Sequence, residues 1–367
     1  MLLAIIVISS IGALLAGLLV LAERVITNYG DVEIDINQSD KKFTIRGGGS
    51  LLESLSAQKI FIPSACGGRS TCGYCKVTVL EGGGGLLPTE EPFMNKDERK
   101  NGVRLSCQVK VRNNLKIEIP EHLLSVREYI CQCEKIIDYT YDIKQFNLKL
   151  IEPDSIKYKA GQYVQLLTPA YEGSSEEVYR AYSISSDPAD NTRFELIVRR
   201  VASGICTTYL FDHLKENDRV RVNGSYGEFY LRDTGAPIVF IAGGSGIAPI
   251  KCILHDMVNQ QNKRRAVFFF GVRGMKDLFL FDEMQEFEKK LADFKYVPVI
   301  SQPEPGDNWT GATGRVTDIA AAYLEKQSDA KDHECYLCGS PGMIDSAIKT
   351  VMQYGIPLEK NYYDKFS

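Results

Sequence analysis

The sequence predicts a multidomain protein that combines α+β and α/β architecture behind an N-terminal transmembrane helix. Three observations support this: an uncharged apolar run at residues 2–22, short strand patterns with turn signals over residues 127–233, and apolar strands alternating with helical stretches after Pro237. We therefore expect an anchor, a small α+β domain, an antiparallel β-barrel and a doubly wound α/β domain. Their predicted bounds are residues 1–25, 30–122, 126–233 and 236–367.

The composition is that of a globular chain with free thiols. Its 367 residues suffice for two to three domains, and 44% hydrophobic with 25% charged residues excludes a disordered chain. A net charge of −4 argues against nucleic-acid binding, and four histidines offer little to a His-rich metal site or a catalytic triad. Three of the ten cysteines lie within ten residues, which is the spacing of metal ligands and not of a disulfide framework. Thiolates that stay free to bind metal indicate a reducing compartment.

The apolar run at residues 2–22 predicts a membrane anchor. A helix of 21 residues, rising about 1.5 Å per residue, just crosses a hydrocarbon layer of ~30 Å. A cleaved signal peptide is the alternative, but no positive segment precedes the run and the run is long for that purpose. Arg24, Lys41 and Lys42 follow, so the positive-inside rule favours a cytoplasmic location for the rest. We expect a single-pass protein of the inner (cytoplasmic) membrane with its soluble domains facing the cytoplasm.

The first soluble module has the patterns of a small α+β fold. Residues 31–37 alternate as a half-buried strand does, and a second short strand is expected around residues 43–45. A short helix is predicted over residues 50–58 and a strand over residues 76–81. The glycines of residues 82–85 predict a flexible insertion after that strand.

Four cysteines in this module have the spacing of iron–sulfur ligands. Cys66, Cys72 and Cys75 follow a C-x5-C-x2-C pattern, and Cys107 comes after 31 further residues. A [2Fe–2S] cluster needs four thiolates, and the plant-type arrangement is a similar loop of three with one distant fourth. Glycines between the first three allow the backbone to curl closely around the cluster. Structural zinc is less favoured, because Cys107 has no near partner. The module is therefore predicted to be a β-grasp [2Fe–2S] ferredoxin domain.

The other cysteines are interpreted as small apolar core residues. Cys131 and Cys133 share one face of a predicted barrel strand, Cys252 lies on a predicted helix, and Cys335 lies on a predicted buried strand.

An Arg-Ala-Tyr-Ser segment predicts a flavin site in the barrel. Arg180 and Tyr182 alternate on one strand and so address the same ligand. A guanidinium can clamp a pyrophosphate, an aromatic ring can lie on an isoalloxazine, and the Ser183 hydroxyl can meet the flavin edge. We expect this strand to bind FAD.

A second segment of the barrel predicts a phosphate cradle. A glycine followed by small and hydroxyl residues opens a helix, where free N–H groups face an anion. The candidate FAD contacts here are Gly204, Cys206 and Thr207.

Two loops of the α/β domain predict a nicotinamide nucleotide site. In the first, a strand at residues 238–242 turns into a helix through glycines that let the backbone approach a pyrophosphate. Its candidate nucleotide contacts are Gly243, Gly244, Gly246 and Pro249.

The second loop follows another strand and contributes Cys338 and Gly339. Cys338 would lie where the nicotinamide meets the flavin, and a buried strand-end cysteine is the alternative interpretation. The aromatic tail is expected to be either docked or disordered. If docked, Phe366 would cover the flavin face that the nicotinamide approaches.

Several motifs resemble one known family over nearly the whole chain. These are the cysteine spacing and the segments Leu87–Glu90, Arg180–Ser183, Asp307–Gly311 and Asp364–Phe366. Together with the module order, they are similar to the F subunit of the sodium-translocating NADH:quinone oxidoreductase. The resemblance implies that the four cysteines hold the cluster, that the 180–183 segment contacts FAD, and that Phe366 stacks on its ring. It also implies NADH as substrate, other membrane subunits as partners, quinone as final acceptor and coupling to sodium transport.

These modules together predict an electron-transfer route. NADH would displace Phe366 and give a hydride to the flavin, with Ser183 hydrogen-bonding near N5 and Cys338 packing against the transfer site. Single electrons would then pass from FAD to the cluster and on to a membrane partner. Arg273 and Lys276 follow the second α/β strand, where the 2′-phosphate of NADPH would lie, although the resemblance favours NADH.

Two other functions share these modules. The reductase component of a multicomponent oxygenase has the same three, but would normally lack the anchor and follow the plant-type cysteine spacing. A non-catalytic anchored scaffold is the other, and the intact cluster ligands and nucleotide loops argue against it.

Overall fold

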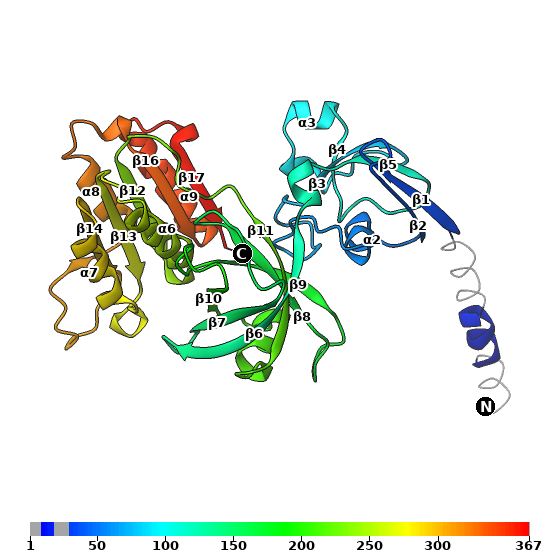
Figure 1. Ribbon diagram of the computed structural model, residues 1–367, viewed down its shortest axis with the longest axis horizontal. Helices are drawn as coiled ribbons and strands as arrows, with labels where there is room; N and C mark the ends of the chain where they lie inside the picture. Colours follow the sequence, from blue (N-terminus) through cyan, green and yellow to red (C-terminus); the bar gives the residue numbers. More distant parts are fainter. Residues whose placement is uncertain (1–8, 18–28, 367) are drawn as a thin grey trace. The chain divides into compact units, whose positions relative to one another are not determined.

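The computed structural model describes residues 9–17 and 29–366 and divides the chain into two compact units, Met1–Arg127 and Glu128–Ser367 (Figure 1). Residues 9–17 form a helix, and the remainder of the predicted span 2–22 lies outside the described residues. Within the ranges described, no helix has both the length and the apolar character needed to cross a bilayer. The transmembrane helix therefore stays a prediction.

The first unit contains a mixed five-stranded sheet with the order β2-β1-β5-β3-β4. β1 pairs in parallel with β5, whereas β1–β2, β3–β4 and β3–β5 are antiparallel. The strands are β1 (Asp31–Ile36), β2 (Lys41–Arg46), β3 (Lys76–Glu81), β4 (Val103–Leu105) and β5 (Leu115–Glu118). The helices are α2 (Leu51–Ala57), η1 (Glu91–Phe93), α3 (Lys96–Lys100) and α4 (Glu121–Leu124).

Helix α2 begins and ends where the sequence predicts. The Ser50 side chain accepts from the Glu53 N–H, and the Glu53 carboxylate accepts from the Ser50 N–H, which completes a capping box. Leu51 and Leu55, one turn apart, are fully buried. The cap and this apolar stripe explain why so short a segment is helical here.

The second unit begins with a six-stranded barrel of the order β10-β7-β6-β11-β8-β9. Ile184, just after β9, bridges to Leu196 of β10 and closes the ring. Cys131 and Cys133 of β6 are fully buried, as predicted. The strands are β6 (Arg127–Asp138), β7 (Ile143–Glu152), β8 (Tyr163–Thr168), β9 (Val178–Ser183), β10 (Arg193–Arg199) and β11 (Arg219–Tyr226). The short helix α5 (Ile205–Thr208) and the π-helical turn η2 (Tyr209–His213) lie between β10 and β11.

The rest of the second unit is a doubly wound parallel sheet of the order β15-β14-β13-β12-β16-β17. Alternate residues of its central strand β12 enter different cores: Phe240 packs into the core shared with the barrel, and Val239 and Ile241 into the core on the other face. The strands are β12 (Ile238–Gly243), β13 (Ala266–Val272), β14 (Phe294–Ile300), β15 (Ala312–Thr313), β16 (Glu334–Gly339) and β17 (Asn361–Lys365). The α-helices are α6 (Ile247–Asn259), α7 (Phe281–Lys290), α8 (Val316–Leu324) and α9 (Pro341–Gln353). The 3₁₀ turns are η3 (Gly244–Gly246), η4 (Met275–Asp277), η5 (Ala330–Asp332) and η6 (Leu358–Lys360).

A buried lysine joins the barrel to the α/β domain. Lys251 of α6 is only 4% exposed and lies 3.0 Å from the Glu195 carboxylate of β10 and 3.1 Å from that of Glu283 of α7. These two carboxylates raise the pKa of Lys251 against the opposing effect of burial. A charge so placed fixes the relative position of strand and helices, because either partner alone would be costly to bury.

The aromatic tail, expected to be either docked or disordered, is docked as the edge strand β17. β17 pairs in parallel with β16, so that Asp364 lies beside Cys338. The Arg232 guanidinium lies 4.1 Å from the Tyr230 ring centroid and 4.6 Å from that of Tyr362. Tyr362 in turn stacks on Tyr336. This cation–aromatic stack ties the terminal strand to the segment that leaves the barrel.

Candidate functional site

The four predicted cluster ligands lie in one region of the first unit as two pairs. The Cys72 thiol donates to the Cys66 sulfur over 3.4 Å, and Cys75 pairs with Cys107 through a second thiol–thiol hydrogen bond. Within the described residues, no group of three or more Cys, His, Asp or Glu side chains converges as a single metal ion requires. Two pairs suit two irons, each held by two thiolates. The donor set thus fits a dinuclear iron–sulfur cluster.

In each pair one cysteine has a lowered pKa and its partner a raised one. The hydrogen bond from Cys72 lowers the pKa of Cys66 to about 4, and that from Cys75 lowers the pKa of Cys107 to about 7. The pKa values of the donors Cys72 and Cys75 are raised, because each thiol proton is held by its partner sulfur. Thiolates are the form that binds metal.

The loop that carries the first three cysteines depends on glycine. Gly73 has a φ of +72°, and a Cβ there would lie 2.6 Å from the Phe93 ring. Neither the backbone conformation nor the space admits a side chain, which accounts for the glycine between the second and third ligands.

A buried ion pair holds the turn that carries the fourth cysteine. Glu90 is fully buried, and its carboxylate accepts from the Arg104 guanidinium and from the backbone N–H groups of Leu87 and Leu105. The Leu105 N–H lies two residues before Cys107. The carboxylate therefore joins the turn at 87–90 to the ligand turn.

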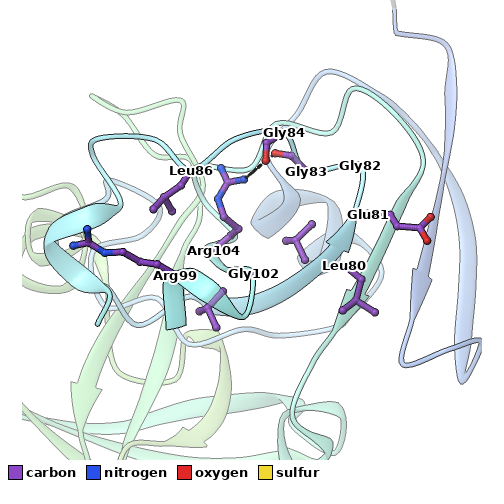
Figure 2. Close-up of a pocket in the computed structure, with 11 residues that line it drawn as sticks. Leu80, Glu81, Gly82, Gly83, Gly84, Leu86, Arg99, Gly102 and Arg104 are labelled. Carbon is purple, nitrogen blue, oxygen red and sulfur yellow. Dashed lines mark hydrogen bonds between the residues drawn. The ribbon is translucent and has the colours of Figure 1, made fainter. Parts of the chain in front are cut away.

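Arg104 also contacts the glycine segment that the sequence predicts to be a flexible insertion. Figure 2 shows its guanidinium directed at the glycine loop, where it donates to the carbonyl oxygens of Gly83 and Gly84 over 2.9 Å each. Gly82 packs so closely that a Cβ would lie 1.9 Å from the Asn114 carbonyl oxygen. The loop borders a cavity of ≈ 250 Å³, and the flexibility of the loop stays a prediction.

The three residues predicted for the flavin lie at the end of β9. Arg180 and Tyr182 are half-buried and two apart on the strand, so they share a face, and Ser183 is 5% exposed. The Arg180 side chain donates to the Tyr179 carbonyl oxygen. Burial raises the pKa of the Tyr182 phenol, which therefore stays protonated.

The predicted phosphate cradle is a single helical turn. Gly204 is the N-cap of α5, and Cys206 is buried beside Tyr182 and Thr168, within hydrogen-bonding reach of both. The Thr207 hydroxyl bonds back to Val201 and to the Gly204 carbonyl oxygen, so a phosphate at this turn would meet backbone N–H groups and not this hydroxyl.

A cavity of ≈ 470 Å³ lies at the carboxyl ends of the parallel strands, as the two nucleotide loops predict. Gly243 and Gly244 of the first loop and Ser340 and Gly342 after β16 line it. The first turns of α8 and α9 also border it. Backbone N–H groups at these helix starts suit a pyrophosphate. Pro249 is buried in the first turn of α6, where a missing N–H costs nothing.

The two nucleotide loops touch at Gly246. A Cβ at this position would lie 2.3 Å from the Cys338 carbonyl oxygen. We expect Gly246→Ala to weaken NADH binding by about tenfold or more, since the loops must separate to admit the methyl group. Gly235→Ala is the control, because a Cβ there meets nothing within 4 Å and Gly235 does not line the cavity. Equal nucleotide affinity of the two variants by calorimetry would refute the role of this contact.

Cys338, Gly339 and Phe366 lie together at the end of β16. The Phe366 N–H donates to the Gly339 carbonyl oxygen over 2.9 Å, and the ring packs on the core that contains Cys338. Cys338 is fully buried, and burial raises its pKa well above the usual range. As a neutral thiol it offers bulk and polarizability, and no nucleophile.

Sequence reasoning missed several charged residues around the cavity. Arg199, at the end of β10, lines it and pairs with Asp142 over 2.7 Å, and Arg315 lines it from the N-cap of α8. Of the two residues flagged for a 2′-phosphate, Arg273 lines the cavity, whereas Lys276 lies near the Tyr141 ring. No local signal identifies Arg199, because its approach to the cavity depends on how the barrel packs against the α/β sheet.

Family comparisons agree with the three modules. A 2Fe-2S iron-sulfur cluster binding domain matches residues 34–112, an oxidoreductase FAD-binding domain matches residues 131–230, and an oxidoreductase NAD-binding domain matches residues 240–349. The chain thus carries domains for a [2Fe–2S] cluster, FAD and NAD.

Known proteins resemble the chain over its length. Among solved structures, the Amycolatopsis cytochrome P450 reductase GcoB is 27% identical with a TM-score of 0.72, covering 91% of this chain and 98% of its own. The ferredoxin reductase in carbazole 1,9a-dioxygenase, at 22% identity and a TM-score of 0.70 over 92% and 99%, shares the fold. The F subunits of the Na(+)-translocating NADH-quinone reductases of Serratia proteamaculans and Yersinia enterocolitica are each 34% identical, covering 95% of both chains. The chain belongs to the family of the F subunits of Na(+)-translocating NADH-quinone reductases.

Proposed function

We propose that this protein is the NADH dehydrogenase subunit of a sodium-translocating quinone reductase complex. It takes electrons from NADH and delivers them singly to a membrane partner and finally to quinone. The observation that carries the proposal is the combination in one chain of paired thiols, a flavin-type barrel strand and a nucleotide cavity. When bound, the flavin accepts a two-electron hydride and the cluster takes up one electron at a time.

The chain's own residues bind and orient these groups. Cys66 with Cys72, and Cys75 with Cys107, would hold the two irons. Arg180 would clamp the flavin pyrophosphate, Tyr182 would lie on the ring and Ser183 would hydrogen-bond near its reactive edge. The N–H groups at Gly204, Cys206 and Thr207 would meet a phosphate.

We propose that the residues around the nucleotide act by excluding water from the flavin and by packing against the bound groups. Gly243 and Gly244 would leave room for the dinucleotide backbone at the cavity, and Gly246 and Gly339 would support it by letting the two loops pack closely. Phe366 would cover the flavin until the nicotinamide replaces it, which keeps water from the reacting face. Cys338 would pack beneath the transfer site as a neutral thiol.

We also propose that the apolar run at residues 2–22 anchors the protein as a single span in the inner (cytoplasmic) membrane, with its domains at 30–122, 126–233 and 236–367 in the cytoplasm. The length of the run and the membrane complex named in the relatives support this. Its partners are then the other subunits of that complex.

An anaerobic titration with NADH tests the dehydrogenase function. Purified full-length protein loaded with FAD and the cluster should lose its visible flavin absorbance after about one and a half equivalents of NADH, because the flavin takes two electrons and the cluster takes one. A flavin that stays oxidised in excess NADH would contradict the proposal.

The reductase component of a multicomponent oxygenase is the second candidate. The 27% identity to GcoB over 91% of the chain favours it, although the quinone reductase subunits are more similar at 34% over 95%. Co-purification from membranes separates the two. Membrane subunits identified by mass spectrometry support the first, and a soluble oxygenase partner supports the second.

A further inference from the structure

A serine of the cysteine-bearing loop contacts the sulfur of the fourth predicted cluster ligand. The Ser70 hydroxyl lies 3.7 Å from Cys107 Sγ, a separation at which the large sulfur atom still takes part in a hydrogen bond. The backbone of Ser70 also hydrogen-bonds to the same sulfur. The two residues are 37 positions apart, so the loop between the first and second ligands folds back onto the turn that carries the fourth.

The fold of this loop brings the contact about. The Ser64 hydroxyl, in a side chain only 3% exposed, accepts from the Gly68 N–H over 3.0 Å. Gly68 has a φ of +87° and packs so that a Cβ there would lie 4.0 Å from the Cys107 Cβ. The loop is therefore held close to Cys107 two residues before Ser70.

Ser70 adopts a backbone conformation that favours glycine. Its φ is +61°, in the left-handed region, where the Cβ of any side chain is crowded by the following carbonyl oxygen. Gly67, Gly68 and Gly73 of the same loop also have positive φ, and a glycine at position 70 would avoid the strain. A strained residue in a ligand loop indicates that its side chain has a role there. The contact that this side chain makes is the hydroxyl–sulfur hydrogen bond.

Iron binding decides which atom of the pair donates. Between a free thiol and a hydroxyl, either atom could be the donor. A cysteine that binds iron has lost its proton, so the Ser70 hydroxyl must then donate to the Cys107 thiolate. Hydrogen bonds to charged acceptors are the stronger kind, and the half-buried position of Ser70 limits competition from water. The Thr71 hydroxyl reaches Cys66, but Thr71 is exposed, which makes it the weaker donor.

We infer that Ser70 raises the reduction potential of the [2Fe–2S] cluster by donating a hydrogen bond from its hydroxyl to Cys107 Sγ. One electron from the reduced flavin adds one negative charge to the cluster and its four thiolates, and a donor at a sulfur stabilises the more negative form. This rests on the proposed function and adds to it a residue that makes the cluster a better acceptor of flavin electrons. Ser70 acts through Cys107 and binds no iron itself.

Two substitutions separate the hydroxyl from the backbone strain. Ser70→Ala removes the hydroxyl alone, and Ser70→Gly removes the hydroxyl and the strain together. In a redox titration of the full-length, cluster-loaded protein followed by electron paramagnetic resonance, both variants should have a lower midpoint potential. We expect the ratio of reduced to oxidised cluster at a fixed solution potential to fall by about three- to tenfold, the effect of one hydrogen bond. Thr89→Val is the matched control and should leave the potential unchanged, because the exposed Thr89 hydroxyl donates to the Gln108 side chain and not to a sulfur.

Resonance Raman spectroscopy of the oxidised protein gives a second readout that does not depend on turnover. Exchange into heavy water should shift an iron–thiolate stretching band of the wild type, and this shift should be smaller in both Ser70 variants. A potential unchanged in both variants, at an iron content equal to that of the wild type, would overturn the inference while leaving the cluster and the dehydrogenase function intact. A potential lowered in Ser70→Ala but normal in Ser70→Gly would assign the effect to backbone strain and would also overturn it. Failure of the wild-type protein to hold a cluster would instead overturn the proposed function.

Discussion

Replacing Cys72 by alanine is expected to abolish NADH-dependent quinone reduction while leaving NADH reduction of the flavin intact. Cys72 forms one of the two thiol pairs, and its loss leaves Cys66 without the partner that completes an iron's ligands. The flavin and nucleotide residues belong to the other compact unit, Glu128–Ser367, and should fold without the cluster. Stopped-flow absorbance for the flavin and a steady-state quinone assay measure the two activities.

Cys335→Ala is the matched control. Cys335 is a fully buried cysteine of β16 with no ligand role, so both activities should persist. Quinone-coupled turnover that survives in Cys72→Ala would remove the cluster from the route, and a flavin that no longer reduces would show that the two units depend on each other.

Replacing Glu90 by alanine is expected to destabilise the first unit strongly. The substitution leaves the buried Arg104 charge unpaired, which costs about 3–5 kcal/mol in comparable ion pairs. It also removes the acceptor for the Leu105 N–H near Cys107. We therefore expect both a lower free energy of unfolding and loss of iron from the protein, measured by denaturant unfolding and by iron content.

Glu91→Ala separates the buried pair from its exposed neighbour. Glu91 lies 3.5 Å from Arg99 with both side chains about half exposed, so its removal should cost at most about 1 kcal/mol. Comparable losses in the two variants would mean that Glu90 does not act through burial. Glu90→Gln, which keeps the shape and an acceptor, should recover part of the iron content.

The sequence predicts local structure well where the signal lies within a few residues. The helix at 50–58 follows from a cap and two leucines one turn apart, and the strands around the nucleotide loops follow from apolar runs that are buried on both faces. The spacing of the four cysteines is informative for the same reason, because three ligands lie on one loop.

Features that depend on distant partners were not predictable in the same way. The glycine loop at 82–85 has the composition of a flexible segment, and its hydrogen bonds from Arg104, some 20 residues away, could not be read from the local sequence. The terminal strand β17 has no alternating pattern of its own and forms because β16 offers an open edge and Arg232 packs on Tyr362. Arg199 and Asp277 reach the cavity only once the sheet has assembled.

The most direct test of the account is low-temperature electron paramagnetic resonance of the full-length protein, reconstituted anaerobically with iron, sulfide and FAD and then mixed with NADH. We predict a brown-yellow protein in which loss of the flavin absorbance is accompanied by the signal of a reduced [2Fe–2S] cluster. A protein that stays colourless after reconstitution, or a flavin that is reduced while the cluster remains oxidised, would contradict it.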